Sequence, residues 1–282
     1  MKKVIINADD FGLVQGVNEG IIKAHREGIL TSATLMANMP GFDQAVEMAG
    51  VNPELGVGVH LNILRGHPVA PARKVGSLLS KEHRFLPSVW KLLSGIALRR
   101  ICLDEVEREF RAQMEKVKAA GIDPTHIDSE KHVHMISPLF RIVLKLAREY
   151  EIDRVRFVRE FCLSSRLGQI LKSMFISLSS ASVKKWMVEQ GVRSPDRFYG
   201  VCDSGRVTAH TLRLAFQRAK EGVTEIMVHP GFITQEMIEL EKQIGPYYIN
   251  KHREEELRAL LDQRLPEVLS DLGIQLINYN HL

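Results

Sequence analysis

Apolar and polar positions follow two different patterns along the 282 residues. Short β-branched or apolar runs of strand length are separated by longer segments in which apolar residues recur at helical spacing. The runs that we predict as strands are 3–7, 32–37, 56–61, 125–128, 154–158, 198–202, 225–229 and 274–279. The segments that we predict as helices are 16–27, 42–49, 103–120, 137–149, 208–221 and 253–272. Strands that alternate with helices indicate a parallel sheet covered by helices.

The number of these strand and helix units favours one of two architectures. Roughly eight units favour an irregular (β/α) barrel of the TIM type, with seven or eight parallel strands, over an open doubly wound sheet. Residues 66–101 and 162–195 do not fit the alternation. Both regions combine leucines, serines and basic residues at partly helical spacing, so we expect helical insertions there. We therefore expect residues 1–282 to form a single α/β barrel domain with two insertions.

The composition excludes several classes of protein. Apolar residues make up 45% and charged residues 26% of the chain, which is typical of soluble globular proteins and not of disordered or fibrous ones. The formal net charge of +4 is far from the dense basic patches of nucleic-acid binders, so we expect no nucleic-acid partner. The three cysteines form no CxxC pair. We therefore expect neither a disulfide framework nor a cysteine zinc site. A cytoplasmic location is expected, since disulfides are rare there.

Carboxylates and imidazoles recur where the predicted strands end. Asp9 and Asp10 follow the first strand, His60 ends the third, and His229 ends the strand at 225–229. In a parallel barrel the carboxyl ends of the strands converge on one mouth, so side chains from separate strands can meet there. The stretch "HIDSEKHVHM" and the strand at 154–158 add further candidates, which are Asp128, His132, His134, Arg156 and Arg159.

Each of these motifs also has a structural interpretation when it is taken alone. Asp9 and Asp10 could form a turn that caps the next helix. A single histidine in an apolar strand, such as His60, is more often a hydrogen-bonded core residue than a ligand, and His229 could pack beneath the Pro-Gly turn that follows it. Paired histidines also occur on exposed strands. Their recurrence at the ends of separate strands favours a metal-assisted site instead.

The residue types define the chemistry of such a site. One carboxylate and two histidines suit a single divalent ion such as zinc, and magnesium and manganese are also compatible. A second carboxylate that does not bind the ion can accept the proton of an attacking water. Because the side chains of Asp9 and Asp10 diverge on a strand, one could face the metal and the other the water. His229 could then protonate a leaving amine, and Arg156 could hold the base in its ionised form or bind substrate.

The motifs resemble those of the YdjC-like carbohydrate deacetylase family, which includes chito-oligosaccharide deacetylases. The similarity runs nearly end to end, through "NADDFG" (7–12), "GVHLN" (58–62), "THIDSEKHVHM" (125–135), "VRFVRE" (155–160) and "MVHPG" (227–231). The resemblance implies an irregular (β/α) barrel, a divalent metal ion, and hydrolysis of an acetamido group on a sugar. Carried over by motif, Asp10, His60 and His132 resemble the metal ligands, Asp9 the general base, and His229 the general acid or a substrate contact.

The resemblance leaves two points open. Either histidine of "HVH" could bind the metal, and we assign His132 as the ligand and His134, with Arg156 and Arg159, to the substrate. Many relatives carry a histidine where this chain has Glu130, and "DSEKHVH" resembles the branch associated with hopanoid lipid biosynthesis. The expected substrates therefore include lipid-linked glycosides as well as soluble chito-oligosaccharides.

The expected function is a metal-dependent N-deacetylase that acts on an N-acetylated amino sugar and releases acetate. A lipid-linked substrate would give the apolar and basic residues of 162–185 a use in peripheral contact with the inner membrane, whereas a lid or a homodimer contact is the alternative. Two other functions stay open. One is a different metal-dependent amidohydrolase or phosphoesterase, although those barrels commonly carry HxH on the first strand. The other is a non-catalytic barrel that binds a sugar or a lipid.

Overall fold

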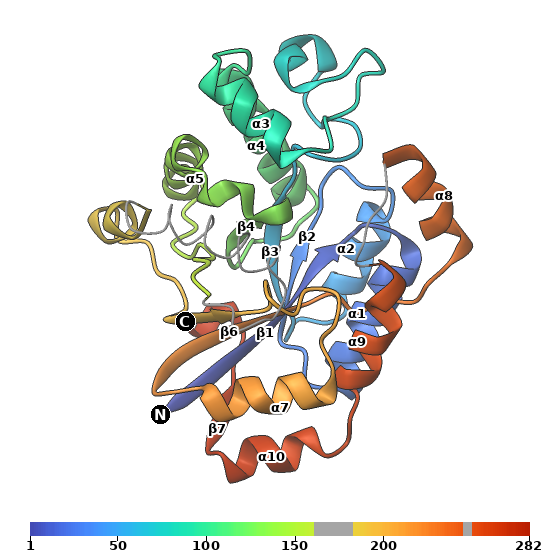
Figure 1. The fold of residues 1–282 in the computed structure, drawn as a ribbon, viewed down its shortest axis with the longest axis vertical. Coiled ribbons are helices and arrows are strands. Elements are labelled where there is room, and N and C mark those ends of the chain that lie inside the picture. Colours follow the sequence, from blue (N-terminus) through green and yellow to red (C-terminus); the bar gives the residue numbers. More distant parts are fainter. Residues whose placement is uncertain (161–182, 245–249) are drawn as a thin grey trace.

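The fold is built on one curled sheet of parallel strands. The computed structural model describes residues 1–160, 183–244 and 250–282. The strands are paired in the order β4-β3-β2-β1-β6-β5, and β7 pairs with β1 (Figure 1). Their bounds are Lys2–Phe11 (β1), Ser32–Leu35 (β2), Gly56–Leu61 (β3), Ile127–Ser129 (β4), Arg197–Tyr199 (β5), Gly222–Val228 (β6) and Ile274–Leu276 (β7). The predicted α/β architecture with seven parallel strands is confirmed.

The sheet curls towards a barrel, and within the described residues it closes through single bridges. Ile127 of β4 forms an isolated parallel bridge with Val155, and Arg154 forms another with Arg193, a few residues before β5. The segment predicted as a strand at 154–158 therefore links the two edges of the sheet without a continuous ladder. These irregular bridges explain why the barrel is incomplete and why that strand prediction is only partly correct.

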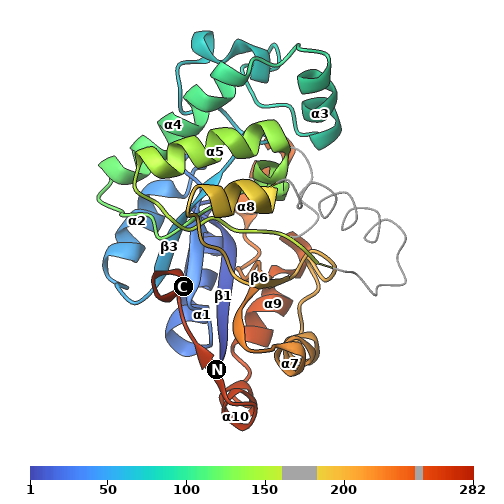
Figure 2. The ribbon, with the colours of Figure 1, turned by 90° about the vertical axis from the view of Figure 1, so that its left-hand side faces the viewer.

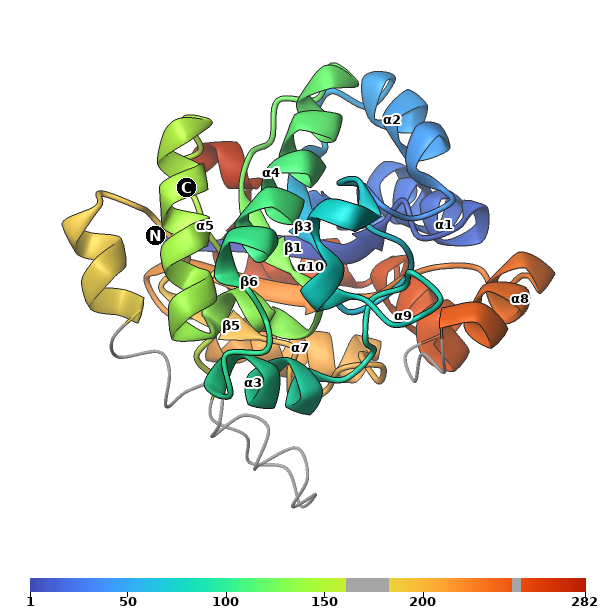
Figure 3. The same cartoon turned by 90° about the horizontal axis from the view of Figure 1, so that it is seen from above.

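Helices lie around the strands, as Figures 2 and 3 show. Those within a few residues of their predicted bounds are α1 (Gln15–Glu27), α2 (Phe42–Gly50), α4 (Leu103–Ala119), α5 (Ser137–Glu149) and α7 (Ala209–Arg218). The predicted helix 253–272 is instead divided into α9 (Arg253–Leu260) and α10 (Leu265–Asp271). Pro266 is at the start of α10, where its missing N–H costs no hydrogen bond, whereas inside one long helix it would remove one. Helix α8 (Gln235–Ile244) was not predicted.

The two predicted insertions differ in how much of them the structure describes. The first contains two short 3₁₀ turns, η1 (Ala72–Lys74) and η2 (Gly76–Leu78), and helix α3 (Val89–Ala97), as the helical prediction requires. In the second, residues 183–189 are helical, whereas 161–182 lie outside the described residues. Most of the segment 162–185, for which membrane contact or, alternatively, a lid or a homodimer contact was expected, therefore lies outside the described residues. Among the helices that are described, none combines the length and the apolar character needed to cross a membrane.

The cysteines depart from the sequence expectation. Cys102 is a free, exposed thiol, but Cys202 is part of a disulfide. No disulfide framework was expected, and the bond at Cys202 was not predicted. Spacing along the chain could not reveal this bond, because a disulfide depends on distance in the folded structure.

The apolar core and the buried polar side chains occupy different levels of the fold. Val4 and Ile6 of β1 are fully buried in one core with Val17 and Ile21 of α1. Polar side chains become buried towards the carboxyl ends of the strands, where Asp9, Asp10, His60, Asp128 and His229 all have little or no exposed surface. Because buried charges require partners, these residues must form a connected polar site.

Candidate metal centre

The end of β1 is distorted where it carries two adjacent carboxylates. On a regular strand the side chains of Asp9 and Asp10 would point to opposite faces. The register between β1 and β2 shifts between Ala8 and Phe11, and Asp10 has a φ of 70°, in the left-handed region. Both aspartates are buried and each belongs to a group of possible metal ligands that includes His60. Asp9 and Asp10 belong to different groups that share His60, so the expectation that one faces the metal and the other the water stays a prediction.

His60 is held in an orientation that suits a metal ligand. Its Nδ1 lies 2.8 Å from Oδ1 of Asp128, and the Thr34 hydroxyl donates to the other Asp128 oxygen at 3.1 Å. Since a carboxylate can only accept, Nδ1 carries the hydrogen in this contact. In the neutral imidazole Nε2 is then left with a lone pair. A carboxylate behind a histidine in this way orients the ring and increases its basicity as a ligand.

Two carboxylates face the Nε2 atom of His60. Asp10 Oδ1 and Glu130 Oε2 each lie 3.8 Å from it, and one ligand atom from each of the three residues lies within 4.8 Å of the others. A second group, within the same limit, consists of Asp9, His60 and Asp128. Two carboxylate oxygens and one imidazole nitrogen are a donor set that divalent cations accept. The residues present therefore fit a metal ion.

The protonation of His60 depends on these carboxylates. Burial opposes the charged imidazole, but Asp128 and Glu130 together outweigh it and raise the pKa of His60 well above 6.5. For Glu130, burial favours the neutral form, but His60 and Arg65 lower its pKa well below 4.5. A cation at this site would take the place of the His60 proton, so its binding must be coupled to proton release.

Each of the two facing carboxylates is also held by an arginine. Arg253, the first residue of α9, donates from Nη2 to Oδ2 of Asp10 at 2.5 Å. Arg65, in the loop after β3, donates from Nε to Oε1 of Glu130 at 3.0 Å. In both cases the arginine contacts the oxygen that does not face His60. The second oxygen of each carboxylate is thereby directed at the Nε2 atom.

Arg156 is the centre of a fully buried charge network. Its Nη1 and Nη2 donate to both oxygens of Asp9 at 2.8 and 2.7 Å, and Nη1 also lies 2.6 Å from Asp128 Oδ2. Its Nε donates to Glu225 at 2.8 Å, and the Tyr279 hydroxyl donates to the other Glu225 oxygen at 2.6 Å. One guanidinium therefore links three carboxylates, one of which is the predicted general base.

The network acts differently on the two carboxylates at its ends. For Asp9, burial favours the neutral form, but the Arg156 fork prevails and lowers the pKa well below 3.8. For Glu225, burial prevails over Arg156 and Tyr279 and raises the pKa to about 7. Asp9 is therefore held as an anion beside His60, whereas Glu225 changes its charge near neutral pH.

The loop that follows β6 brings His229 to the same group. A Cβ placed on Gly20 of α1 would lie 2.4 Å from the Gly231 Cα, so only glycine allows α1 to approach this loop so closely. Burial lowers the pKa of His229 to about 4, although Asp9 and Asp10 oppose that shift. Its buried Nδ1 has no hydrogen-bond partner among the described residues, and the nearest carboxylate oxygen, from Glu256, is 3.9 Å away. His229 is thus a neutral imidazole beside two carboxylates.

The "HVH" histidines do not share one face, because the chain is not extended there. Strand β4 ends at Ser129 and a 3₁₀ segment, η3 (Glu130–Met135), follows with a φ of 57° at His132. The ring of His132 packs edge-on against Phe198, and His132 belongs to neither group of possible ligands. Both ring nitrogens of His134 contact the protein, at 2.7 Å from Ser129 Oγ and 3.0 Å from the Arg156 carbonyl. Its burial lowers the pKa to about 3.

The predicted site residues thus fall into two sets. Asp9, Asp10, His60, Arg156 and His229 come together at the carboxyl ends of the strands. By contrast, Arg159 is exposed, and His132 and His134 are buried beside the site with the contacts described above. The roles assigned to all eight residues stay predictions.

Several residues of the site were not predicted, and the sequence carried only one signal for them. Glu130 lies two residues after Asp128 in the stretch "HIDSEKHVHM", which placed it near the site without giving it a role. Arg65, Arg253 and Tyr279 have no motif of their own. Their contacts arise from loops and helices that approach the site only in the folded chain.

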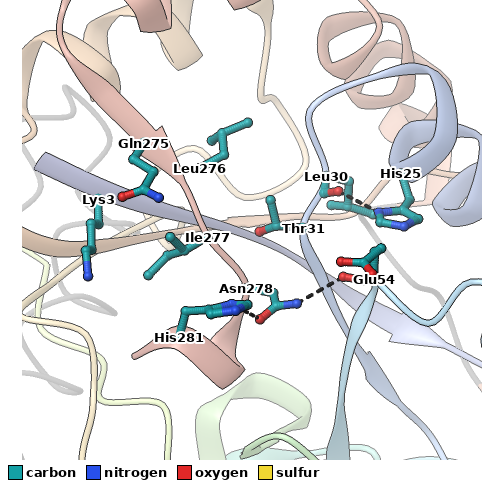
Figure 4. A pocket seen from close by; sticks show the side chains of 10 residues that line it. All are labelled: Lys3, His25, Leu30, Thr31, Glu54, Gln275, Leu276, Ile277, Asn278 and His281. Carbon is teal, nitrogen blue, oxygen red and sulfur yellow. Dashed lines mark hydrogen bonds between the residues drawn. The ribbon is translucent and has the colours of Figure 1, made fainter.

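A separate cavity lies at the opposite end of the sheet. It has a volume of about 490 Å³, and its lining includes Lys3 at the start of β1 and Thr31 immediately before β2 (Figure 4). Asn278 and Glu54 also line the cavity, and Asn278 donates from Nδ2 to the Glu54 carbonyl at 3.0 Å. Because all strands are parallel, this end is remote from Asp9 and Asp10. The cavity is therefore not part of the candidate metal centre.

The buried carboxylate of Glu256 gives a pH-dependent prediction. Burial raises its pKa to about 7, although it accepts a hydrogen bond from the His229 backbone N–H at 2.6 Å. Between pH 4.5 and 7 the folded state then binds a proton that the unfolded state has lost, so Glu256 lowers stability as pH rises. Glu256→Gln is expected to match the wild type near pH 4.5 and to exceed it by on the order of 2–3 kcal/mol at pH 8.

Urea unfolding of both proteins at several pH values measures this difference. The exposed Glu267→Gln serves as the matched control, and its stability relative to wild type is expected to change little. A Glu256→Gln advantage that does not grow with pH would contradict the prediction.

The fold and the site together define a class of protein. It is an α/β protein with a curled parallel sheet, which holds a buried group of carboxylates and histidine, able to bind a divalent cation, at the carboxyl ends of its strands. The chain belongs to the YdjC-like protein family, whose model matches residues 3–271. The predicted family is confirmed.

Similar proteins extend over the whole chain. It is 38% identical to a carbohydrate deacetylase of Brevibacillus brevis, over 99% of both proteins. It is 36% identical to a carbohydrate deacetylase of Geobacillus stearothermophilus, over 98% of this chain and 96% of that protein. The crystal structure of a proposed cellobiose-phosphate cleavage protein from Enterococcus faecalis covers 99% of this chain and 98% of its own, with 30% identity and a TM-score of 0.79.

Proposed function

We propose that this protein is a metal-dependent hydrolase that removes the N-acetyl group of an amino sugar and releases acetate. The observation that carries the proposal is the buried group of Asp10, His60 and Glu130, with Asp128 behind His60. A non-catalytic barrel would have no use for several buried charges that are directed at one point, because each costs desolvation free energy. The names of the curated relatives supply the substrate class, which is an acetylated carbohydrate.

The residues of the site divide the proposed reaction between them. A divalent ion held by Asp10 and His60 would polarise the acetamide carbonyl and acidify an attacking water. Asp9, kept anionic by Arg156, accepts the proton of that water. His229 is neutral at rest because its pKa is about 4, so it first takes up the proton that Asp9 removed from the water and then passes it to the leaving amine. Collapse of the tetrahedral species releases acetate and the free amine.

The substrate proposed here is an oligosaccharide or a lipid-linked glycoside. The departure at Glu130 is the sequence feature that supports inclusion of the lipid-linked class, as in hopanoid biosynthesis. Peripheral contact with the inner membrane and a homodimer belong to the same proposal. A panel of chito-oligosaccharides and N-acetylglucosaminyl lipids, with acetate release as the measurement, distinguishes these substrates.

Metal removal tests the proposed reaction. Treatment with a chelator is expected to abolish acetate release from the best substrate of the panel, and addition of zinc or manganese is expected to restore it. His60→Ala should stay inactive under both conditions, because it lacks the nitrogen that faces Asp10 and Glu130. Elemental analysis confirms the metal content of each sample.

Two results would contradict the proposal in different ways. Full acetate release from a sample shown to be free of metal would refute the metal dependence. Failure of the folded, metal-loaded protein to release acetate from every member of the panel would refute the deacetylase activity.

A further inference from the structure

Glu130, one of the two carboxylates that face His60 Nε2, is held in place by the surrounding protein. Glu130 is 2% exposed, and its two oxygens have different neighbours. Oε1 accepts a hydrogen bond from Arg65 Nε at 3.0 Å, whereas Oε2 lies 3.8 Å from His60 Nε2. A carboxylate with one oxygen bound to the protein can offer the other oxygen to a cation without losing its orientation.

The backbone of Arg65 is itself held by two asparagines. Its N–H donates to Asn62 Oδ1 at 3.1 Å, and its carbonyl accepts from Asn38 Nδ2 at 2.9 Å and from Asn62 Nδ2 at 3.0 Å. Asn62 is in turn fixed by Gln113, which accepts from the Asn62 N–H at 2.9 Å. Asn62 and Gln113 are fully buried. Arg65 is therefore presented to Glu130 from a rigid loop.

We propose that Glu130 is the third metal ligand of this chain and that Arg65 is the positioning residue that directs its Oε2 atom towards His60. The inference rests on the proposed metal dependence and gives it a definite ligand set of two carboxylates and one imidazole. Such a set is richer in oxygen than one with two histidines. It shifts the relative preference of the site towards oxygen-seeking ions such as manganese and magnesium, and away from zinc.

The geometry also argues against His132 in this role. His132 lies on a turn of left-handed backbone and its ring packs against Phe198. The described ligand atoms that converge within 4.8 Å of one another come from Asp10, His60 and Glu130. Replacement of His132 should therefore have little effect on metal affinity.

Metal affinity, measured without substrate, tests the ligand assignment. Mn²⁺ and Zn²⁺ are titrated separately into the metal-free protein. Calorimetry or a competing fluorescent chelator monitors each titration and gives the two Kd values. Glu130→Gln keeps the shape but loses the charge, and is expected to weaken Mn²⁺ binding at least tenfold. Glu130→His is expected to raise the ratio of the Mn²⁺ Kd to the Zn²⁺ Kd at least tenfold. His132→Ala is the matched control and should keep both constants within threefold of wild type.

The role of Arg65 needs a variant that preserves its charge. Arg65→Lys loses the Nε contact but keeps the cation, and partners of this kind typically contribute 10- to 100-fold to metal affinity. We expect Arg65→Lys to weaken the binding of both Mn²⁺ and Zn²⁺ about tenfold in the wild-type background. In the Glu130→His background the same substitution should leave both affinities unchanged. A residue with a merely structural role would act equally in both. Thermal unfolding of each metal-free variant verifies that it is folded.

The outcomes separate this inference from the proposed activity. If Glu130→Gln keeps the wild-type Mn²⁺ affinity, or if His132→Ala loses it, Glu130 is not the third ligand. If Arg65→Lys acts equally in both backgrounds, Arg65 is not a positioning residue. Should Glu130→His fail to fold, the comparison of Glu130→Gln with His132→Ala still decides the ligand. If the variants show the expected metal affinities but the protein releases no acetate, the proposed deacetylase activity is refuted and the ligand assignment stands.

Discussion

Asp9→Asn is expected to lower the turnover number for acetate release by roughly 10²- to 10⁴-fold, the usual contribution of a general base. The amide occupies the space of the carboxylate but cannot accept a proton from water. Asp9 is not part of the group of Asp10, His60 and Glu130, so the affinity for metal should stay within about threefold of wild type. Steady-state kinetics together with metal titration measures the two effects separately.

The matched control for this substitution is an exposed aspartate. Asp271→Asn makes the same chemical change at the end of α10 and should leave turnover unchanged. If Asp9→Asn keeps more than a third of the wild-type turnover number, Asp9 is not the base. Loss of metal affinity in parallel with turnover would instead make Asp9 a ligand, as the second group of Asp9, His60 and Asp128 would allow.

Arg156→Met is expected to reduce the free energy of unfolding by about 3–5 kcal/mol, because it leaves buried carboxylates without their shared cation. Arg156 is fully buried and contacts Asp9, Asp128 and Glu225. Part of the loss should depend on pH. Glu225 has a pKa of about 7, so below that value it is neutral and needs the guanidinium less. Urea unfolding at pH 5.5 and pH 8 should therefore show the larger deficit at pH 8.

An exposed arginine provides the comparison for the same substitution. Arg264 pairs with Asp262 at 2.8 Å, but its side chain is 72% exposed. Exposed ion pairs contribute about 0–1 kcal/mol, so Arg264→Met should cost no more than that. A deficit for Arg156→Met as small as that of Arg264→Met would show that the buried network does not stabilise the fold.

The sequence predicted the fold to the extent that local patterns control it. Strand β3 and helix α5 begin and end where their apolar spacing predicts, because burial against the sheet follows that spacing. The closure of the barrel was less predictable. It depends on single bridges at Val155 and Arg193, which involve one residue each and leave no periodic signal. The division between α9 and α10 was visible in principle, since Pro266 cannot lie inside a helix at no cost.

The candidate site was predictable from strand ends but not in its detail. Asp9, Asp10 and His60 follow from the rule that the carboxyl ends of parallel strands converge. The distortion at Asp10 and the turn at His132 are backbone effects that apolar spacing does not encode, so neither could be predicted. The arginines that orient the carboxylates were missed because each comes from a distant part of the chain.

The contact between Asp10 and Arg253 joins positions that are 243 residues apart. During synthesis the amino-terminal strands emerge long before α9, whereas a domain generally folds as a unit. The contact between Asp10 and Arg253 therefore cannot form until nearly the whole polypeptide has left the ribosome. Completion of the ion-binding centre is consequently a late step of maturation, and carboxyl-terminal truncation products would carry an unfinished one.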